Sequence, residues 1–67
     1  MNIHIKNITA DSLELRDMIF DIGVNYSIHK DTYIFNNANK KVEDKIDEIL
    51  EHFKNKNQSI IVTKGII

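Results

Sequence analysis

The sequence predicts an α+β fold of the ferredoxin-like, split-βαβ type, with the element order strand, helix, strand, strand, helix, strand. Two observations carry this prediction: short stretches in which apolar and polar residues alternate, and two longer stretches in which apolar residues recur with the period of a helix. Right-handed crossovers would place both helices on one face of a four-stranded antiparallel sheet, with the first and third strands in its centre. The chain of 67 residues is long enough for one such domain, residues 1–67.

The first strand and the first helix are separated by a capping signal. Residues 2–8 alternate between apolar and polar side chains, which is typical of a half-buried strand. Asp11 is a good N-cap, and Glu14 three residues later would complete a capping box. The helix should span residues 12–22, because Gly23 suits the position just past its end. Its stripe of core-facing residues is predicted to contain Leu15, Met18, Ile19 and Ile22.

A β-hairpin should follow this helix. Two alternating stretches, residues 24–29 and 32–36, flank Lys30 and Asp31. A two-residue loop and a four-residue loop would give the same strand pairing. One face of the hairpin should then point to the core, and the other should stay open. The core face is predicted to carry Tyr26, Ile28, Tyr33 and Phe35, and the open face Ser27, His29 and Ile34.

The second helix and the last strand complete the order. Asn39 is a good N-cap, and residues 40–56 carry the most regular amphipathic pattern in the chain. Residues 59–63 are rich in β-branched side chains, which is typical of a strand, and a short apolar tail follows them. The helix is predicted to bury Val42, Ile46, Ile49, Leu50 and Phe53, and the sheet to bury Ile3, Ile5, Ile60 and Val62.

Composition excludes several classes of protein. The formal net charge of −1 gives no overall attraction to nucleic acid or to anionic lipid. The chain has no cysteine, which excludes disulfides and thiolate chemistry. No apolar run approaches the ~20 residues that a membrane-spanning helix needs. The N-terminal residues lack the apolar segment of a signal peptide, so we expect a cytoplasmic protein.

The sequence shows no pattern typical of an active site or a metal site. Its three histidines are His4, His29 and His52. Glu48 and His52 lie one helical turn apart, but such pairs are common on solvated helices and supply only two ligands. No serine lies in a glycine-rich turn, and the two glycines cannot form a phosphate-binding loop. We therefore expect no catalytic residues, no metal and no cofactor.

Two aromatic residues raise the question of nucleic-acid binding. Tyr33 and Phe35 alternate on a strand predicted to be central, where RNA-binding domains of the split-βαβ type stack bases. The predicted pairing turns both rings toward the core, however, and the basic residues of the chain are scattered. We therefore expect these rings in the core and do not expect a nucleic-acid partner.

The first helix carries two apolar residues on the side opposite its core stripe. Leu13 and Phe20 lie there, seven residues apart and therefore on one line of the helix, beside Asp17. Either they are buried, because they fold over the rim of the core or because the helix is covered on two sides, or they form an exposed anchor for a protein partner. Leu13, Asp17 and Phe20 are therefore candidate partner-binding residues.

The second helix carries acidic residues opposite its apolar stripe. This acidic face is either an ordinary solvated surface or a ridge that binds the basic surface of a protein partner. The residues that would form the ridge are Asp44, Asp47, Glu48 and Glu51.

The fourth strand is expected at an edge of the sheet. Lys64 is the only charged residue near it, and apolar edges without protection pair with other chains. We expect a homodimer through this edge and the apolar tail of Ile66 and Ile67, or through the open sheet face with Ile34 and Ile61.

These patterns together predict a small, non-enzymatic protein-binding module, such as a stoichiometric inhibitor or an adaptor. The proline-free composition, rich in Ile, Asn and Lys, is typical of an AT-rich phage or mobile element. Two alternatives belong to other classes: a small-molecule-sensing regulatory domain that acts as a dimer, and a nucleic-acid-binding domain. Sensing domains of this fold often bind their ligand near a glycine turn that follows the first strand. The first alternative is weakened because residues 7–11, which follow the first strand here, contain no glycine.

Overall fold

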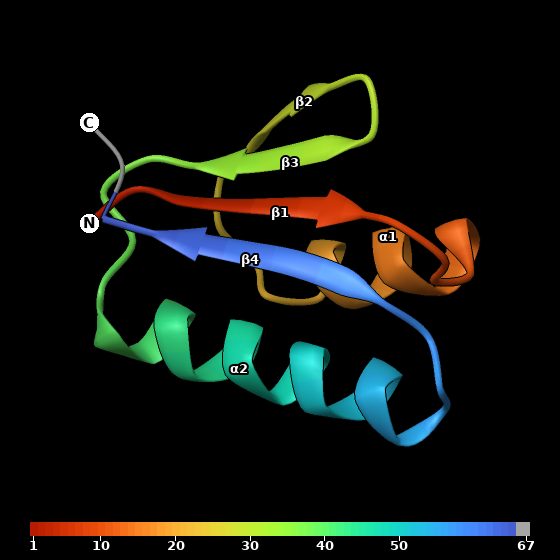
Figure 1. Ribbon diagram of the computed structural model, residues 1–67. Coiled ribbons are helices and arrows are strands. Elements are labelled where there is room, and N and C mark those ends of the chain that lie inside the picture. Colours follow the sequence, from red (N-terminus) through yellow and green to blue (C-terminus); the bar gives the residue numbers. More distant parts are fainter. Residues whose placement is uncertain (66–67) are drawn as a thin grey trace.

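The structure is a computed structural model that describes residues 1–65 (Figure 1). Six elements follow one another in the predicted order. They are β1 (Ile3–Asn7), α1 (Ser12–Phe20), β2 (Ser27–His29), β3 (Thr32–Phe35), α2 (Lys40–Asn55) and β4 (Ile60–Lys64). The apolar tail predicted at Ile66 and Ile67 lies outside the described residues.

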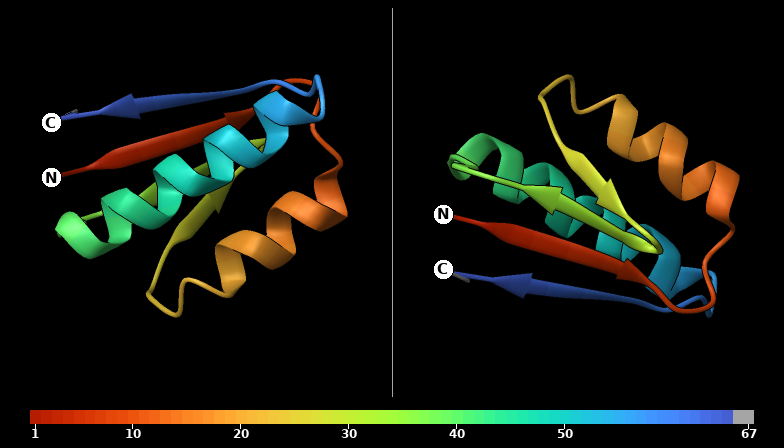
Figure 2. Two further views of the ribbon diagram at one scale, coloured as in Figure 1. Left: turned by 90° about the horizontal axis from the view of Figure 1, so that it is seen from below. Right: turned by 90° about the horizontal axis from the view of Figure 1, so that it is seen from above.

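The four strands form one sheet in the order β2-β3-β1-β4, in which every neighbouring pair is antiparallel. Both helices cover the same face of this sheet, with α2 beneath its centre and α1 toward the β2 side (Figures 1 and 2). The α+β class, the two-layer arrangement and the central position of β1 and β3 are therefore confirmed.

The core lies between the sheet and the helices. The residues predicted on the two helix stripes are all buried or half-buried, so the helical phases are confirmed. The buried apolar residues are Ile3, Ile5, Ala10, Leu15, Ile19, Phe35, Val42, Ile46, Ile49, Phe53 and Ile60. Around them pack the half-buried residues Met18, Ile22, Tyr26, Tyr33, Ala38, Leu50 and Val62.

Both predicted N-caps are present, although the capping box is incomplete. The Asp11 side chain accepts a hydrogen bond from the Glu14 backbone N–H at 2.9 Å, and the Asn39 side chain accepts one from the Val42 N–H at 3.0 Å. The backbone N–H of Asp11 donates to the side chain of Gln58 at 3.2 Å. The Glu14 side chain is thereby free to contact α2 instead of returning to its own cap.

The hairpin has the predicted register and the shorter of the two predicted loops. Ile28 pairs with Tyr33, and only Lys30 and Asp31 separate the two strands. Lys30 adopts a positive φ of 57°. This tight loop therefore imposes on a lysine a backbone conformation that is uncommon for residues other than glycine. The Tyr26 ring lies 5.6 Å from the ring of Phe35, as the predicted pairing requires.

The prediction that Ile28 is buried in the core is wrong. Ile28 points to the helix side of the sheet with Tyr33, yet 56% of its surface is exposed. Its strand has only three residues and stands at the edge of the sheet, so it has a neighbouring strand on one side only. The correct face was predicted, but the position at the edge leaves this side chain uncovered. The first helix also ends at Phe20, two residues earlier than expected.

Candidate protein-binding surface

The outer side of α1 exposes both apolar residues singled out by the sequence. Phe20 is 71% exposed and Leu13 is 61% exposed, whereas Leu15 and Ile19 on the inner side are fully buried. The cap at Asp11 fixes where the helix begins, and burial of the inner stripe fixes its rotation. The interpretation in which Leu13 and Phe20 are buried, over the rim of the core or on a second covered side of the helix, is therefore wrong.

Phe20 is part of a wider apolar region at the β2 side of the molecule. It lines an open hollow together with Gly23, Val24, Asn25 and Tyr26. Val24 in this loop is exposed. Ile28, two residues beyond Tyr26 on β2, is also exposed, although it does not line the hollow. We call Phe20, Val24 and Ile28 the α1–β2 surface. Sequence reasoning missed Val24 and Ile28 as surface residues. The strand predicted over residues 24–29 begins only at Ser27, so Val24 lies in the loop before it, and alternation cannot tell that Ile28 stands on an uncovered edge.

Acidic side chains accompany this surface. Asp17 is exposed, and its carboxylate lies 3.9 Å from the Arg16 guanidinium, a long contact between two solvated groups. Asp21 is exposed directly after Phe20, at the C-cap of α1. An apolar anchor beside two carboxylates is chemically suited to an apolar pocket with a basic border.

The four acidic residues predicted on α2 do not share one environment. Asp44 pairs with Lys40 at 3.1 Å, and Asp47 pairs with Lys64 at 2.8 Å. Glu48 faces the groove toward α1. Glu51 is exposed and has no ion pair within residues 1–65. Two of the four charges are thus partly neutralised within the chain, and the binding ridge remains a prediction.

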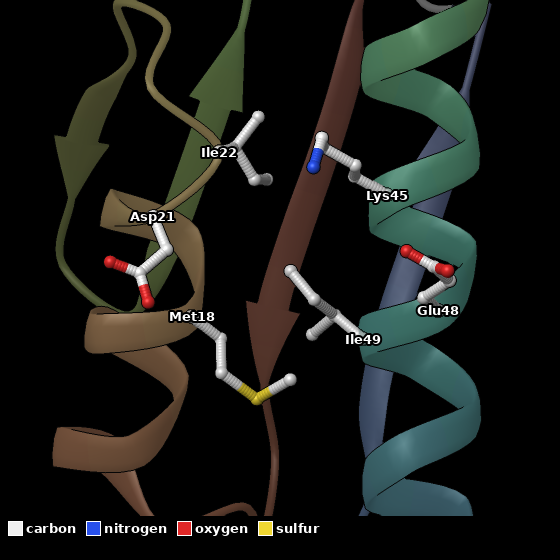
Figure 3. A pocket seen from close by; sticks show the side chains of 6 residues that line it. All are labelled: Met18, Asp21, Ile22, Lys45, Glu48 and Ile49. Carbon is white, nitrogen blue, oxygen red and sulfur yellow. The ribbon is translucent and has the colours of Figure 1, made fainter.

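A shallow groove separates the two helices. Figure 3 shows Met18 and Ile49 pointing toward each other across it, with Lys45 reaching from α2 toward Ile22. Its volume of about 180 Å³ is below the ~300–1,000 Å³ of typical small-molecule pockets. The groove has space for one side chain of a partner, and Asp21 and Glu48 are the acidic residues that line it.

Glu14 joins the start of α1 to the end of α2. Its carboxylate accepts a hydrogen bond from the Lys56 ammonium at 2.7 Å and lies 3.1 Å from His52 Nε2. The His52 ring in turn meets the Phe53 ring edge-on, with centroids 5.1 Å apart. The pKa of the Glu14 carboxyl lies below its ordinary value of 4.5, because Lys56 and then His52 hydrogen-bond to its ionised form.

This cluster makes the stability of the fold sensitive to acid. Because the pKa of Glu14 is lower in the folded chain than in the unfolded one, the carboxylate stabilises the fold above its unfolded pKa. That contribution is lost as the pH falls through the folded pKa. We expect Glu14→Gln to be less stable than wild type at neutral pH and to converge with it in acid, as measured by urea unfolding.

Glu51→Gln is the matched control, because Glu51 is an exposed acidic residue of α2 that makes no ion pair with Glu14, His52 or Lys56. Its acid profile should follow wild type. If Glu14→Gln and wild type lose stability in parallel down to strongly acidic pH, the cluster does not stabilise the fold.

The remaining histidines lie on the open face of the sheet. Strand β3 lies between the strands of His4 and His29, and His4 pairs with Ile34 while His29 pairs with Thr32. His52 contacts Glu14 rather than the Glu48 of the predicted pair. Residues 1–65 contain no group of three or more His, Asp or Glu side chains placed to hold a metal ion.

The two aromatic residues of β3 face the helices. Phe35 is 1% exposed, and Tyr33 is half-buried with its ring centroid 5.9 Å from that of Tyr26. Burial raises the pKa of the Tyr33 hydroxyl. Neither ring is therefore offered on the open face, where a base would stack.

Within the described part of the chain, no helix is both long and apolar enough to cross a membrane. Comparisons with protein-family models, with curated proteins and with solved structures gave no match. The structure itself thus defines the molecule as a two-layer α+β domain, whose helix α1 carries an exposed surface of apolar and acidic residues.

Proposed function

We propose that this chain is a small, non-enzymatic protein-binding module that docks on its partner through α1. The observation that supports the proposal is the exposure of Phe20 and Leu13 on one line of this helix. Aromatic residues at the centre of an interface commonly contribute most of its binding energy. A module of this kind acts by occupying a surface, as a stoichiometric inhibitor or as an adaptor.

The partner should offer an apolar pocket bordered by basic side chains. Phe20 would enter the pocket, and the basic side chains would meet the carboxylates of Asp17 and Asp21. Val24 and Ile28 would extend the contact toward β2. The chain has no cysteine and thus needs no oxidising compartment to fold, and we propose that it acts in the cytoplasm.

The test compares wild type with the double variant Leu13→Ser, Phe20→Ser. The immobilised chain captures partners from a lysate of its host, mass spectrometry identifies them, and calorimetry measures their affinity. We expect the double variant to weaken the complex by at least ~2 kcal/mol, or roughly 30-fold in Kd. Raising the salt concentration should slow association, because the acidic residues steer the encounter.

Ile8→Ser is the matched control, because Ile8 is an exposed apolar residue of the β1–α1 connection, away from the outer line of α1. It should bind like wild type. Unchanged affinity in the folded double variant would exclude docking through α1.

A further inference from the structure

The edge strand β4 offers more unpaired backbone groups than the edge strand β2. Gly65 N–H donates to the Asn2 carbonyl at 2.9 Å and Ile8 N–H donates to the Ser59 carbonyl at 3.1 Å. Together with the register between β1 and β4, these bonds make Ile61 and Thr63 the residues that hydrogen-bond to β1. The N–H and C=O groups of the alternating residues Ile60, Val62 and Lys64 therefore point away from the sheet.

The opposite edge strand, β2, offers fewer unpaired backbone groups. Asn7 N–H donates to the Asp31 carbonyl at 3.0 Å, which makes Thr32 and His29 a hydrogen-bonded pair of the hairpin. In the three-residue strand β2, only Ile28 then directs its backbone groups outward. A strand that adds to this sheet would consequently gain more hydrogen bonds on β4.

Most of the usual protections of an edge strand are missing from β4, and the one that is present is the inward-pointing charge of Lys64. Its charged residue, Lys64, is held against α2, with its ammonium 2.8 Å from Asp47 and 3.2 Å from Glu43. The pairing of β1 with β4 runs without a bulge, and the sequence contains no proline. Ile61 is 52% exposed on the open face of the same strand.

We propose that β4 pairs antiparallel with β4 of a second copy of this chain, about a two-fold axis at Val62. In this register Val62 faces Val62 of the second copy, and Ile60 faces its Lys64. All three residues with outward backbone groups become hydrogen-bonded pairs, and Ile61 lies across from Thr63 of the second copy, a β-branched pair. The product is a symmetric dimer with one continuous eight-stranded sheet.

The same two-fold axis would bring opposite charges of the two α2 helices toward each other. The ion pairs of Lys64 show that Glu43 and Asp47 lie on the side of α2 next to β4. Lys54 lies two turns beyond Asp47 on the same side of the helix. The axis reverses the second α2, so that Lys54 of each copy lies toward Glu43 of the other. Leu50, half-buried between these charges, would be covered together with Val62.

This dimer is independent of the proposed docking through α1. α1 lies toward the β2 side of the sheet, and β4 is the opposite edge (Figure 2). Both surfaces can thus be occupied at once, and a dimer would present two copies of α1 to its partners.

The test combines sedimentation equilibrium with amide hydrogen exchange on the full chain, over concentrations from micromolar to millimolar. We expect a monomer–dimer equilibrium in which the amides of Ile60, Val62 and Lys64 exchange more slowly as the dimer forms. The amides of Ile61 and Thr63 bond to β1 and should be protected at every concentration. If the chain stays monomeric at every concentration, the proposal is wrong. It is then wrong even if a strand of another protein pairs with this edge.

Backbone N-methylation of the chemically synthesised chain distinguishes the two edges without changing a side chain. N-methylation at Val62 removes the two hydrogen bonds at the axis and should weaken the dimer at least ~10-fold. The matched control is N-methylation at Ile28, whose amide also points outward, and which should leave the dimer unchanged. If methylation at Ile28 dissociates the dimer and methylation at Val62 does not, the interface lies on the other edge and the proposal is wrong.

Discussion

Replacing Phe35 with alanine is expected to destabilise the protein by about 3–5 kcal/mol, the usual cost of removing a buried phenyl ring. Phe35 is 1% exposed and lies on the central strand β3, where its backbone pairs with Ile3 of β1. Its ring also contacts Tyr26. The loss would be most or all of the stability that a domain of this size possesses. Urea unfolding followed by circular dichroism measures the effect.

Ile34→Ala is the matched control for this substitution. Ile34 is the preceding residue and points to the open face of the sheet, where it is half-buried. Its truncation should cost clearly less than that of Phe35. A Phe35→Ala chain that melts within a few degrees of wild type would show that the register of β3 is wrong.

Truncation of two adjacent residues of α1 should change the stability of the fold by very different amounts. Ile19 is fully buried, so Ile19→Ala is expected to cost about 2–5 kcal/mol of stability. Phe20 is largely exposed, so Phe20→Ala should change stability by less than about 0.5 kcal/mol, although it removes the larger side chain. Thermal and urea unfolding of the two single variants gives the comparison directly.

This contrast tests the rotation of α1, on which the proposed binding surface depends. A Phe20→Ala chain as unstable as Ile19→Ala would place Phe20 in the core and remove the basis for docking through α1. A stable Phe20→Ala chain also ensures that any loss of partner binding reflects a lost contact rather than unfolding.

The elements of this protein could be predicted because their signals are local. The cap residues Asp11 and Asn39 lie directly before their helices, and each hydrogen-bonds to an N–H three residues later. The period of apolar residues then fixes which side of each helix is buried, as the full burial of Leu15 and Ile46 shows. The same periodicity places Phe20 on the side of α1 opposite its buried stripe.

The candidate site could be predicted only in part. The exposure of Leu13 and Phe20 was one of two interpretations, because the sequence does not say whether the rim of the core reaches around the helix. The acidic face of α2 was predicted as a set of four. The pair of Asp44 with Lys40 is a local contact one helical turn apart, whereas the pair of Asp47 with Lys64 depends on which side chains the fold brings near. Lys64 is distant in sequence and adjacent only through the packing of β4 on α2.

The sequence by itself determined the order of the elements, their faces and the class of fold, because periodicity and capping act over a few residues. Only the tertiary structure decided that Ile28 is exposed, since burial depends on what covers a strand and β2 stands at an edge. It also decided that Glu14 meets His52 and Lys56 rather than its own cap. Such contacts join residues about 40 positions apart, and no local pattern encodes the distance between two packed helices.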